Sequence, residues 1–150
     1  VHLDADGQHD DPSILSHILE PLHREEADVV YGSRFLGIDP EGMPLARRVL
    51  LRGARLFSCY VLGISHKVTD PQSGLRAIKA HVAEELVFSQ DGMAHCSEIL
   101  KWITRSSHRW QEVPVRVRYT EASLKKGQKA ADALRITWQL LLGALARSEK

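Results

Sequence analysis

Apolar and polar positions along the chain repeat at two different spacings. Between residues 12 and 25, apolar side chains recur every three or four positions, which predicts a helix with one core-facing stripe that Pro21 should kink or end. Further helices are predicted at about 45–62, 80–88, 94–106 and 129–147, and strands at 28–34, 75–78 and 112–119. This alternation favours an α/β fold with a parallel sheet, whose strand ends line a ligand crevice.

The first twelve residues have the pattern of a strand that delivers two carboxylates to its end before the first helix. Asp4 and Asp6 are two positions apart, so both side chains lie on one face of a strand and can reach one divalent cation. Asp11 is placed to act as the N-cap of the following helix and Pro12 as its first residue. The alternative interpretation is a capped strand-to-helix turn with solvated acids.

Two other families contain similar acidic strings. A calcium EF-hand loop that starts at Asp4 requires glycine at its sixth position and glutamate at its twelfth, and these are His9 and Leu15 here, so that hypothesis fails. Haloacid dehalogenase phosphatases also begin with a hydrophobic strand and Asp-x-Asp-Gly, usually followed by threonine. Gln8 replaces that threonine. A phosphohydrolase of this type therefore stays as the alternative.

The composition sets limits on the class of protein. With 150 residues, 43% of them hydrophobic, the chain can bury one core and is expected to form a single domain. The formal net charge of +1 argues against nucleic acid as a partner. Cys59 and Cys96 have no metal-type or disulfide spacing, so we expect core thiols and a reducing, cytoplasmic setting. The longest apolar run, 140–146, is shorter than the roughly 20 residues of a membrane-spanning helix.

Five segments taken together resemble a known family. They are DADGQHDDP at 4–12, ADVVYGSRFLG at 27–37, P-x-x-R at 44–47, VTDPQSGLRAI at 68–78 and EVPVRVRY at 112–119. In this order they resemble the family 2 glycosyltransferases of GT-A fold, in the branch that contains dolichol-phosphate mannose synthase and bacterial polyprenyl-phosphate sugar transferases. The resemblance implies a Rossmann-like, mostly parallel sheet flanked by helices.

The resemblance also implies which part of the domain this is. The chain starts without methionine and inside a strand, so residues 1–150 are expected to be the C-terminal, metal and acceptor part of one GT-A domain, with the N-terminal nucleotide-binding half missing. In the family, the aspartates of this motif hold Mg²⁺ or Mn²⁺ against the diphosphate of a nucleotide-sugar. This role carries over to Asp4 and Asp6, with Gln8 as a helper.

The other site residues follow from the same resemblance. Arg34 and Arg47 match positions that clamp an acceptor phosphate, and guanidinium suits bidentate phosphate recognition. Asp70 matches a position near the sugar, and Glu98 is the other candidate base for a hydroxyl acceptor. The remaining predicted phosphate-binding residues lie on a strand and the loop after it: Arg116, Arg118, Ser123 and Lys125.

Each of these assignments has a structural alternative. Arg34 can form an ion pair with a nearby helix acid, and Asp70 can stabilise a turn with Ser73. An acid in the first turns of a helix, such as Glu98, is often a partner of the helix dipole. Many relatives carry serine four residues after the arginine that matches Arg47, where this chain has Leu51, and this departure weakens the prediction of a lipid-phosphate acceptor.

The resemblance thus implies an enzyme that moves a sugar, with inversion as in the family, from a nucleotide-sugar to a lipid phosphate or a hydroxyl acceptor. Besides the phosphohydrolase, the other alternative is a non-catalytic fragment that binds a membrane surface or a partner protein. The apolar helix at 129–147 fits a core helix, or peripheral membrane contact if the acceptor is a lipid. We expect a cytoplasmic location, at the cytoplasmic face of the membrane in the lipid case.

Overall fold

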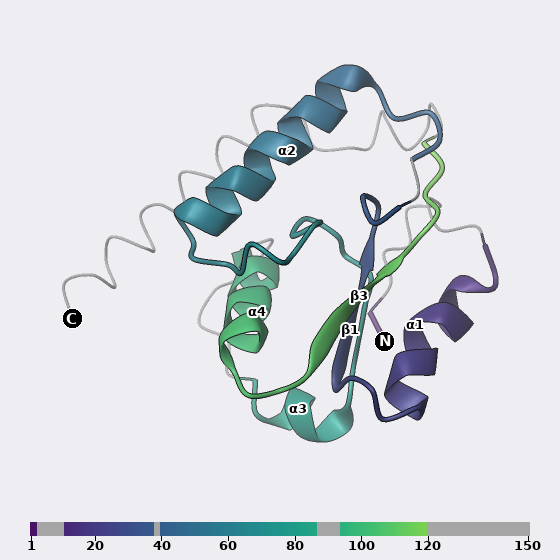
Figure 1. The fold of residues 1–150 in the computed structure, drawn as a ribbon, viewed down its shortest axis with the longest axis vertical. Coiled ribbons are helices and arrows are strands. Elements are labelled where there is room, and N and C mark those ends of the chain that lie inside the picture. The colour runs from purple at the N-terminus through teal and green to yellow at the C-terminus, as the bar shows by residue number, and fades with distance from the viewer. Residues whose placement is uncertain (3–10, 38–39, 87–93, 120–150) are drawn as a thin grey trace.

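The computed structural model describes residues 1–2, 11–37, 40–86 and 94–119, and in this part of the chain a small sheet lies between helices (Figure 1). The elements in chain order are α1 (Ile14–His23), β1 (Val29–Ser33), α2 (Leu45–Tyr60), β2 (Arg76–Ile78), α3 (Ala80–Glu84), α4 (Ala94–Arg105) and β3 (Trp110–Pro114). The predicted α/β class is confirmed, and each helix and strand predicted within the described ranges is present, although β3 begins two residues before its predicted start and ends five residues before its predicted end.

The three described strands form a mixed sheet in the order β2-β1-β3, which corrects the expectation of a mostly parallel one. β3 runs parallel to β1, from Val29 opposite Trp110 to Ser33 opposite Pro114. β2 runs antiparallel to β1, with Val29 opposite Ile78. The reason lies in the turn before β2, since Asp70 of this turn contacts Arg34 directly after β1. The chain therefore enters β2 at the end where β1 finishes.

β1 is buried on both faces of the sheet, and its alternating side chains belong to two separate cores. Val30 packs with Ile18 and Leu22 of α1. Val29 and Tyr31 pack on the other face, in a cluster that includes Leu62, Ile64, Val68, Val82, Ile99, Leu100 and Ile103. Helices cover both faces (Figure 1), so β1 is fixed from both sides and the residues that follow it start from a rigid position.

Two boundaries differ from the prediction for local reasons. α1 begins at Ile14 with Ser13 at its cap, and Oδ1 of Asp11 accepts hydrogen bonds from the N–H and hydroxyl of Ser13 at 2.9 and 2.7 Å. Pro21 lies inside α1, which ends two residues later at His23. The helix thus ends within one turn of the proline, whose ring removes one helical donor.

The segment after β3 keeps the predicted alternation without continuing the strand. Val115, Val117 and Tyr119 are buried while Arg116 and Arg118 are exposed. The last hydrogen bond to β1 is the one that the N–H of Val115 donates to the carbonyl of Ser33, where β1 ends. Beyond this point the chain pairs with Glu41 instead. The buried positions of this segment therefore point towards the core beside the end of β1.

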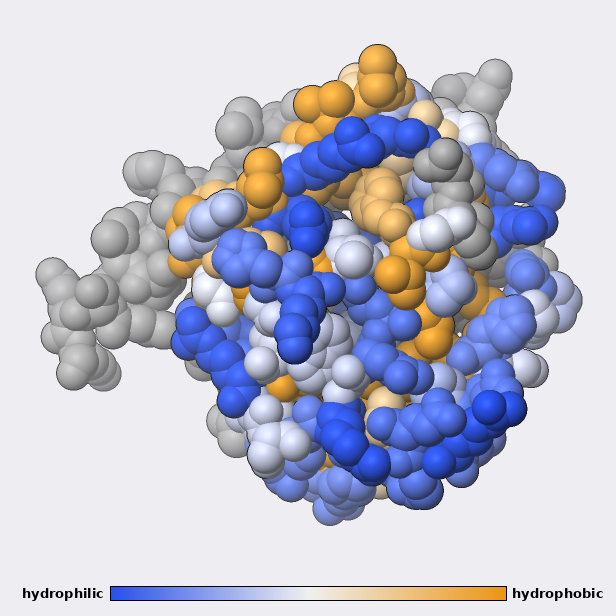
Figure 2. All heavy atoms as spheres, in the orientation of Figure 1, coloured by the Kyte–Doolittle hydropathy of each residue, from blue (hydrophilic) through white to orange (hydrophobic). Residues whose placement is uncertain are grey.

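α2 lies beyond the carboxyl ends of β1 and β3 and exposes apolar side chains (Figure 1). Leu45, Val49, Leu56 and Tyr60 follow helical spacing and are 54% to 75% exposed. Figure 2 shows hydrophobic atoms gathered along this helix at the top of the view. Among the helices of the described residues, none has the length and apolarity required to cross a membrane.

The two cysteines are free thiols. Cys59 is buried, as expected for a core thiol, whereas Cys96 is only partly buried and accepts a hydrogen bond from Nη2 of the buried Arg76 at 3.0 Å. The prediction of a core thiol is therefore correct for Cys59 and too simple for Cys96.

An ion cluster ties the opposite end of the sheet together. The carboxylate of Asp28 accepts hydrogen bonds from the backbone N–H and side chain of Arg109 and from Nζ of Lys79. These hydrogen bonds, above all the one from the Arg109 side chain, hold the pKa of Asp28 far below its usual value. Partial burial acts in the opposite direction and is outweighed. The folded state therefore favours the charged carboxylate.

We expect Asp28→Asn to lower the free energy of unfolding by about 1–2 kcal/mol at pH 7. Because the folded pKa of Asp28 is depressed, the stabilisation is complete above the unfolded pKa and is lost as pH falls through the folded one. The difference between wild type and variant should thus shrink progressively below about pH 4. Urea denaturation across this pH range measures it, with Glu20→Gln, from the exposed pair with Arg24, as the control. A difference independent of pH would contradict the assignment.

Candidate functional site

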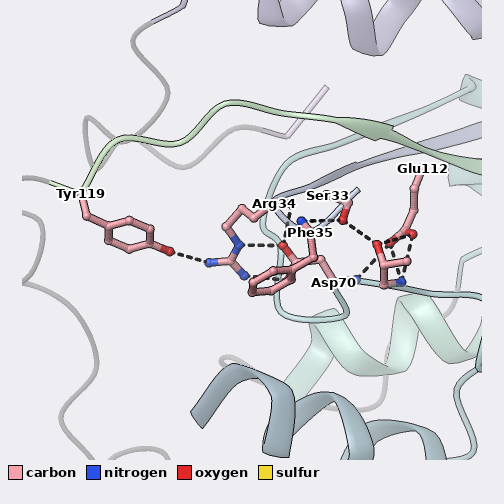
Figure 3. A network of polar contacts seen from close by, with 7 residues as sticks. Ser33, Arg34, Phe35, Asp70, Glu112 and Tyr119 are labelled. Carbon is pink, nitrogen blue, oxygen red and sulfur yellow. Dashed lines mark hydrogen bonds and ion pairs between the residues drawn. The ribbon is translucent and has the colours of Figure 1, made fainter. Parts of the chain in front are cut away.

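Polar side chains from several segments meet at the carboxyl ends of β1 and β3. Figure 3 shows them as one network, with Tyr119 on one side of Arg34 and Asp70, and Ser33 and Glu112 on the other. Ser33 ends β1 and Asp70 lies in the turn before β2, while Glu112 lies in β3. The carboxyl edge of a sheet is a common place for ligand binding in α/β proteins.

Arg34 and Asp70 form a buried, bidentate ion pair. Nε of Arg34 lies 2.6 Å from Oδ2 of Asp70, and Nη2 lies 2.7 Å from Oδ1. The Arg34 side chain is 10% exposed and that of Asp70 is fully buried. Burial alone would lower the pKa of Arg34, but the hydrogen bonds and negative charge of Asp70 raise it above its usual value. The guanidinium is therefore charged at every pH at which the protein is folded.

Tyr119 connects this pair to the second predicted arginine. Its hydroxyl accepts a hydrogen bond from Nη1 of Arg34 at 3.2 Å, and the guanidinium carbon of Arg47 lies 5.2 Å from its ring centroid. This distance is in the range of a cation–π contact. Nε of Arg47 is buried and has no hydrogen-bond partner among the described residues. A charged donor in this state indicates a place for an acceptor.

Glu112 holds the turn that carries Asp70. Its carboxylate accepts hydrogen bonds from the backbone N–H of Thr69 at 2.9 and 3.0 Å, from the hydroxyl of Thr69 at 2.7 Å and from the backbone N–H of Asp70 at 3.1 Å. Oγ of Ser33 lies 2.6 Å from Oγ1 of Thr69. Because Thr69 donates its proton to Glu112, Ser33 is the donor in that second contact. The hydroxyl protons are therefore donated in one direction, from Ser33 of β1 to Thr69 of the turn and from Thr69 to Glu112 of β3.

A pocket of about 510 Å³ lies beside Thr69, between the segment after β1 and α2. Its lining residues are Phe35, Gly37, Arg48, Leu51, Arg52, Arg55 and Thr69. Arg55 is held in place because its Nε and Nη2 donate to the backbone carbonyls of Val68 and His66. Among the described residues, three arginines and no carboxylate line this pocket, so the charge of these residues suits an anionic group.

The structure brings together three of the predicted site residues, namely Arg34, Arg47 and Asp70. The alternative for Arg34, an ion pair, is present, although its partner lies in a turn and not in a helix. The Asp70 side chain faces Arg34, while Ser73 donates its N–H to the backbone carbonyl of Asp70 at 3.1 Å. The turn and the ion pair thus use different atoms of Asp70.

The other described candidates lie away from this pair. Arg116 is exposed and lines a second pocket together with Asp11, which lies just before α1. Nε of Arg118 lies 3.6 Å from a carboxylate oxygen of Glu41, and the Arg118 side chain is 59% exposed. Glu98 is partly buried on α4. The remaining predicted residues lie outside the described ranges: Asp4, Asp6, Gln8, Ser123 and Lys125.

The predicted metal site is not among the residues that the structure describes. Within these residues no group of three or more His, Cys, Asp or Glu side chains is placed to hold a metal ion. The start of the chain is nevertheless tied to β2, since His2 and Arg76 exchange backbone hydrogen bonds of 2.8 and 3.1 Å in an antiparallel bridge. His2 is two residues before Asp4.

Sequence reasoning missed four members of the network, which are Ser33, Thr69, Glu112 and Tyr119. Glu112 and Tyr119 lie in EVPVRVRY, Thr69 in VTDPQSGLRAI and Ser33 in ADVVYGSRFLG, three segments that contribute to the family resemblance without giving any of these residues a role. The available signal for Glu112 was a single acid in an apolar strand, directly before Val113 and Pro114. An acid in such a place requires hydrogen-bond donors from elsewhere in the fold. Which donors these are depends on the pairing of β3 with β1.

Comparison with known proteins finds relatives that are similar over most of this chain. No known protein-family profile matches the chain. The chain is 32% identical over 145 residues to the UDP-N-acetylglucosamine–dolichyl-phosphate N-acetylglucosaminyltransferase of Methanococcus voltae. It is 30% identical over 145 residues to an uncharacterised protein of Methanocaldococcus jannaschii and 28% identical over 144 residues to the dolichol-phosphate mannosyltransferase of Pyrococcus furiosus.

These similarities cover 94% to 95% of this chain but only part of each relative. The chain spans 58% and 57% of the length of the Methanocaldococcus and Methanococcus proteins, and 40% of the Pyrococcus protein. Two of the three relatives have names that identify them as sugar transferases acting on dolichyl phosphate. The similarity therefore supports a glycosyltransferase family for this chain.

Proposed function

We propose that the protein is an inverting family 2 glycosyltransferase of GT-A fold, which moves a sugar from a nucleotide-sugar to a polyprenyl phosphate. In this proposal residues 1–150 form the metal and acceptor part of the domain. The names of the relatives support the class of reaction. The observation that supports a phosphate acceptor is Arg47 of α2, whose Nε is buried and has no hydrogen-bond partner among the described residues.

The acceptor phosphate has a place beside Arg47. A phosphate oxygen would satisfy its buried Nε, and the ring of Tyr119 holds the guanidinium at this position. The donors of Arg34 that face Asp70 and Tyr119 are already in use. Arg34 therefore orients Tyr119 and adds positive charge close to the phosphate, while Arg47 makes the direct contact.

A phosphate acceptor is already ionised at neutral pH, so it requires orientation more than a general base. Asp70 fits this requirement, because both of its carboxylate oxygens bind Arg34 and its role is to keep that cation in place. With a hydroxyl acceptor, Asp70 or Glu98 would have to accept a proton. Arg116, Arg118, Ser123 and Lys125 stay predicted ligands of the substrate phosphates.

Asp4, Asp6 and Gln8 are proposed to hold Mg²⁺ or Mn²⁺. Two carboxylates and one amide oxygen are a suitable donor set for a hard divalent cation. His2, two residues before Asp4, pairs through its backbone with Arg76 of β2. When bound, such an ion would stabilise the negative charge on the leaving nucleoside diphosphate.

A lipid acceptor also fits the surface near the site. The exposed apolar stripe of Leu45, Val49, Leu56 and Tyr60 lies on the same helix as Arg48 and Arg52 of the cationic pocket. An amphipathic surface of this kind suits the interface of a membrane, with apolar side chains towards the acyl region and arginines towards phosphate groups. We therefore propose peripheral contact of α2 with the cytoplasmic face of the membrane.

The test is sugar transfer by the complete natural protein, with labelled nucleotide-sugars and polyprenyl phosphate in detergent micelles. We expect transfer to the lipid phosphate and no hydrolysis of phosphate monoesters. Arg47→Ala should raise the KM for the acceptor at least about tenfold, because a buried charged hydrogen bond is lost, and leave the KM for the donor unchanged. Arg24→Ala, at the exposed arginine directly after α1, is the matched control.

Two results would contradict this proposal. Hydrolysis of phosphate monoesters without sugar transfer would favour a phosphohydrolase. Transfer to a polyprenyl phosphate with an unchanged acceptor KM in Arg47→Ala would remove Arg47 from the acceptor site.

A further inference from the structure

We propose that Glu112 is a positioning residue for sugar transfer, which acts by holding Asp70, and through it Arg34, at the carboxyl edge of the sheet. This inference rests on the proposed function and adds to it a residue that makes no contact with substrate. It follows from the contacts of one carboxylate with two consecutive backbone amides and one hydroxyl. All of these donors are neutral, so Glu112 is not part of the ion pair.

The contacts of Glu112 fix the peptide that joins Thr69 to Asp70. Both N–H groups of this turn point at the same carboxylate, at 2.9 and 3.1 Å. The Asp70 side chain then extends to Arg34, and it also accepts the backbone N–H of Arg34 at 3.1 Å. The position of the Arg34 guanidinium thus depends on Asp70, and the position of Asp70 depends on Glu112.

Glu112 is held by a rigid element. It lies in β3 opposite Tyr31 of β1, two residues before the pair of Ser33 and Pro114 that ends the parallel ladder. The turn that carries Asp70 is therefore attached to β3 by Glu112 and to β1 by the contact between Ser33 and Thr69. Figure 3 shows these attachments on the side of Asp70 that faces away from Tyr119.

Glutamine cannot replace this carboxylate. A glutamine at this position has one acceptor oxygen, and its NH₂ group would face either the hydroxyl of Thr69 or a backbone N–H. If the NH₂ group faced a backbone N–H, two donors would oppose each other. If it faced Thr69, the hydroxyl of Thr69 would accept from it and donate to Ser33, and the buried Ser33 hydroxyl would lose its acceptor. Either arrangement leaves a buried donor unsatisfied, and the turn would shift to reach another partner. A displacement of about 1 Å in a group that orients a reactant can reduce the rate by about a hundredfold.

The experiment compares Glu112→Gln with two variants of its partner in the complete natural protein. Thr69→Val removes the hydroxyl donor, whereas Thr69→Ser keeps it. We expect kcat to fall about 10- to 100-fold in Glu112→Gln and Thr69→Val, with the KM for the donor unchanged, and to recover in Thr69→Ser. Glu84→Gln, an exposed acid of α3, is the control.

A second measurement reports the position of Arg34 without any turnover. Hydrogen exchange of the Arg34 Nε–H, followed by NMR, should be slow in wild type and in Thr69→Ser, and faster in Glu112→Gln and Thr69→Val. If the Arg34 Nε–H exchanges slowly in wild type but the protein transfers no sugar, the proposed function is refuted while the positioning of Arg34 by Glu112 stands. Wild-type kcat and unchanged Arg34 exchange in Glu112→Gln would overturn the role of Glu112. If Glu112→Gln does not fold, the contrast between the two Thr69 variants decides the question.

Discussion

Replacing Asp70 with asparagine is expected to lower the free energy of unfolding by about 3–5 kcal/mol. The Asp70 side chain is fully buried and both of its oxygens bind Arg34, whose side chain is 10% exposed. Asparagine keeps the shape but removes the negative charge, so Arg34 becomes a buried cation without a counter-charge. The total free energy of unfolding of a domain of this size is about 5–15 kcal/mol, so the expected loss is a large part of it. Urea denaturation followed by circular dichroism measures the loss.

The matched control is Glu41→Gln, because Glu41 also pairs with an arginine, Arg118, but both side chains are more than half exposed. That change should cost less than about 1 kcal/mol. The double variant Arg34→Met with Asp70→Leu should recover much of the stability, since apolar side chains often replace a buried ion pair at little cost. Sugar transfer should stay lost. A loss below about 1 kcal/mol in Asp70→Asn would mean that solvent reaches the pair.

Asp6→Asn is expected to reduce metal-dependent sugar transfer at least about a hundredfold, because a bound divalent ion contributes several kcal/mol to the stabilisation of the leaving diphosphate. Asparagine removes one negative charge from the proposed donor set while it keeps an oxygen ligand. Transfer by the complete natural protein is measured as a function of Mn²⁺ and Mg²⁺ concentration.

Asp10→Asn is the control for this variant, since it removes an acid of the same segment that is not one of the proposed metal ligands Asp4, Asp6 and Gln8. Binding of Mn²⁺ with nucleoside diphosphate, followed by electron paramagnetic resonance, gives a readout that does not depend on turnover. Near-normal transfer by Asp6→Asn without added metal would exclude the proposed metal role of this motif.

The elements of the fold were predictable because their signals are local. The apolar spacing of α1, α2 and α4, and the buried runs of β1 and β2, indicate these elements directly. The boundaries were less predictable: β3 starts at Trp110 and ends at Pro114, since its extent depends on where β1 ends. The antiparallel direction of β2 was missed for a similar reason, because it depends on a contact between Asp70 and Arg34, which are 36 residues apart.

The candidate site was predictable only as a set of residue types. Arg34, Arg47 and Asp70 were identified by their motifs, but nothing in those motifs shows that Asp70 neutralises Arg34 or that Arg47 stacks on Tyr119. Glu112 and Thr69 had no assigned role, because their importance comes from hydrogen bonds across a separation of 43 residues. Such contacts have no periodicity along the chain.

The sequence by itself determined the α/β class, the presence of a strand at β1 and the arginines and acids available for chemistry. These features depend on the periodicity of apolar side chains and on residue identity, which are properties of short segments. Only the tertiary structure decided which charges pair, which buried donor lacks a partner and which side chains hold the site in place. The reason is physical: the energy of a buried charge depends on the distance to its counter-charge and on the exclusion of water, and long-range packing sets both.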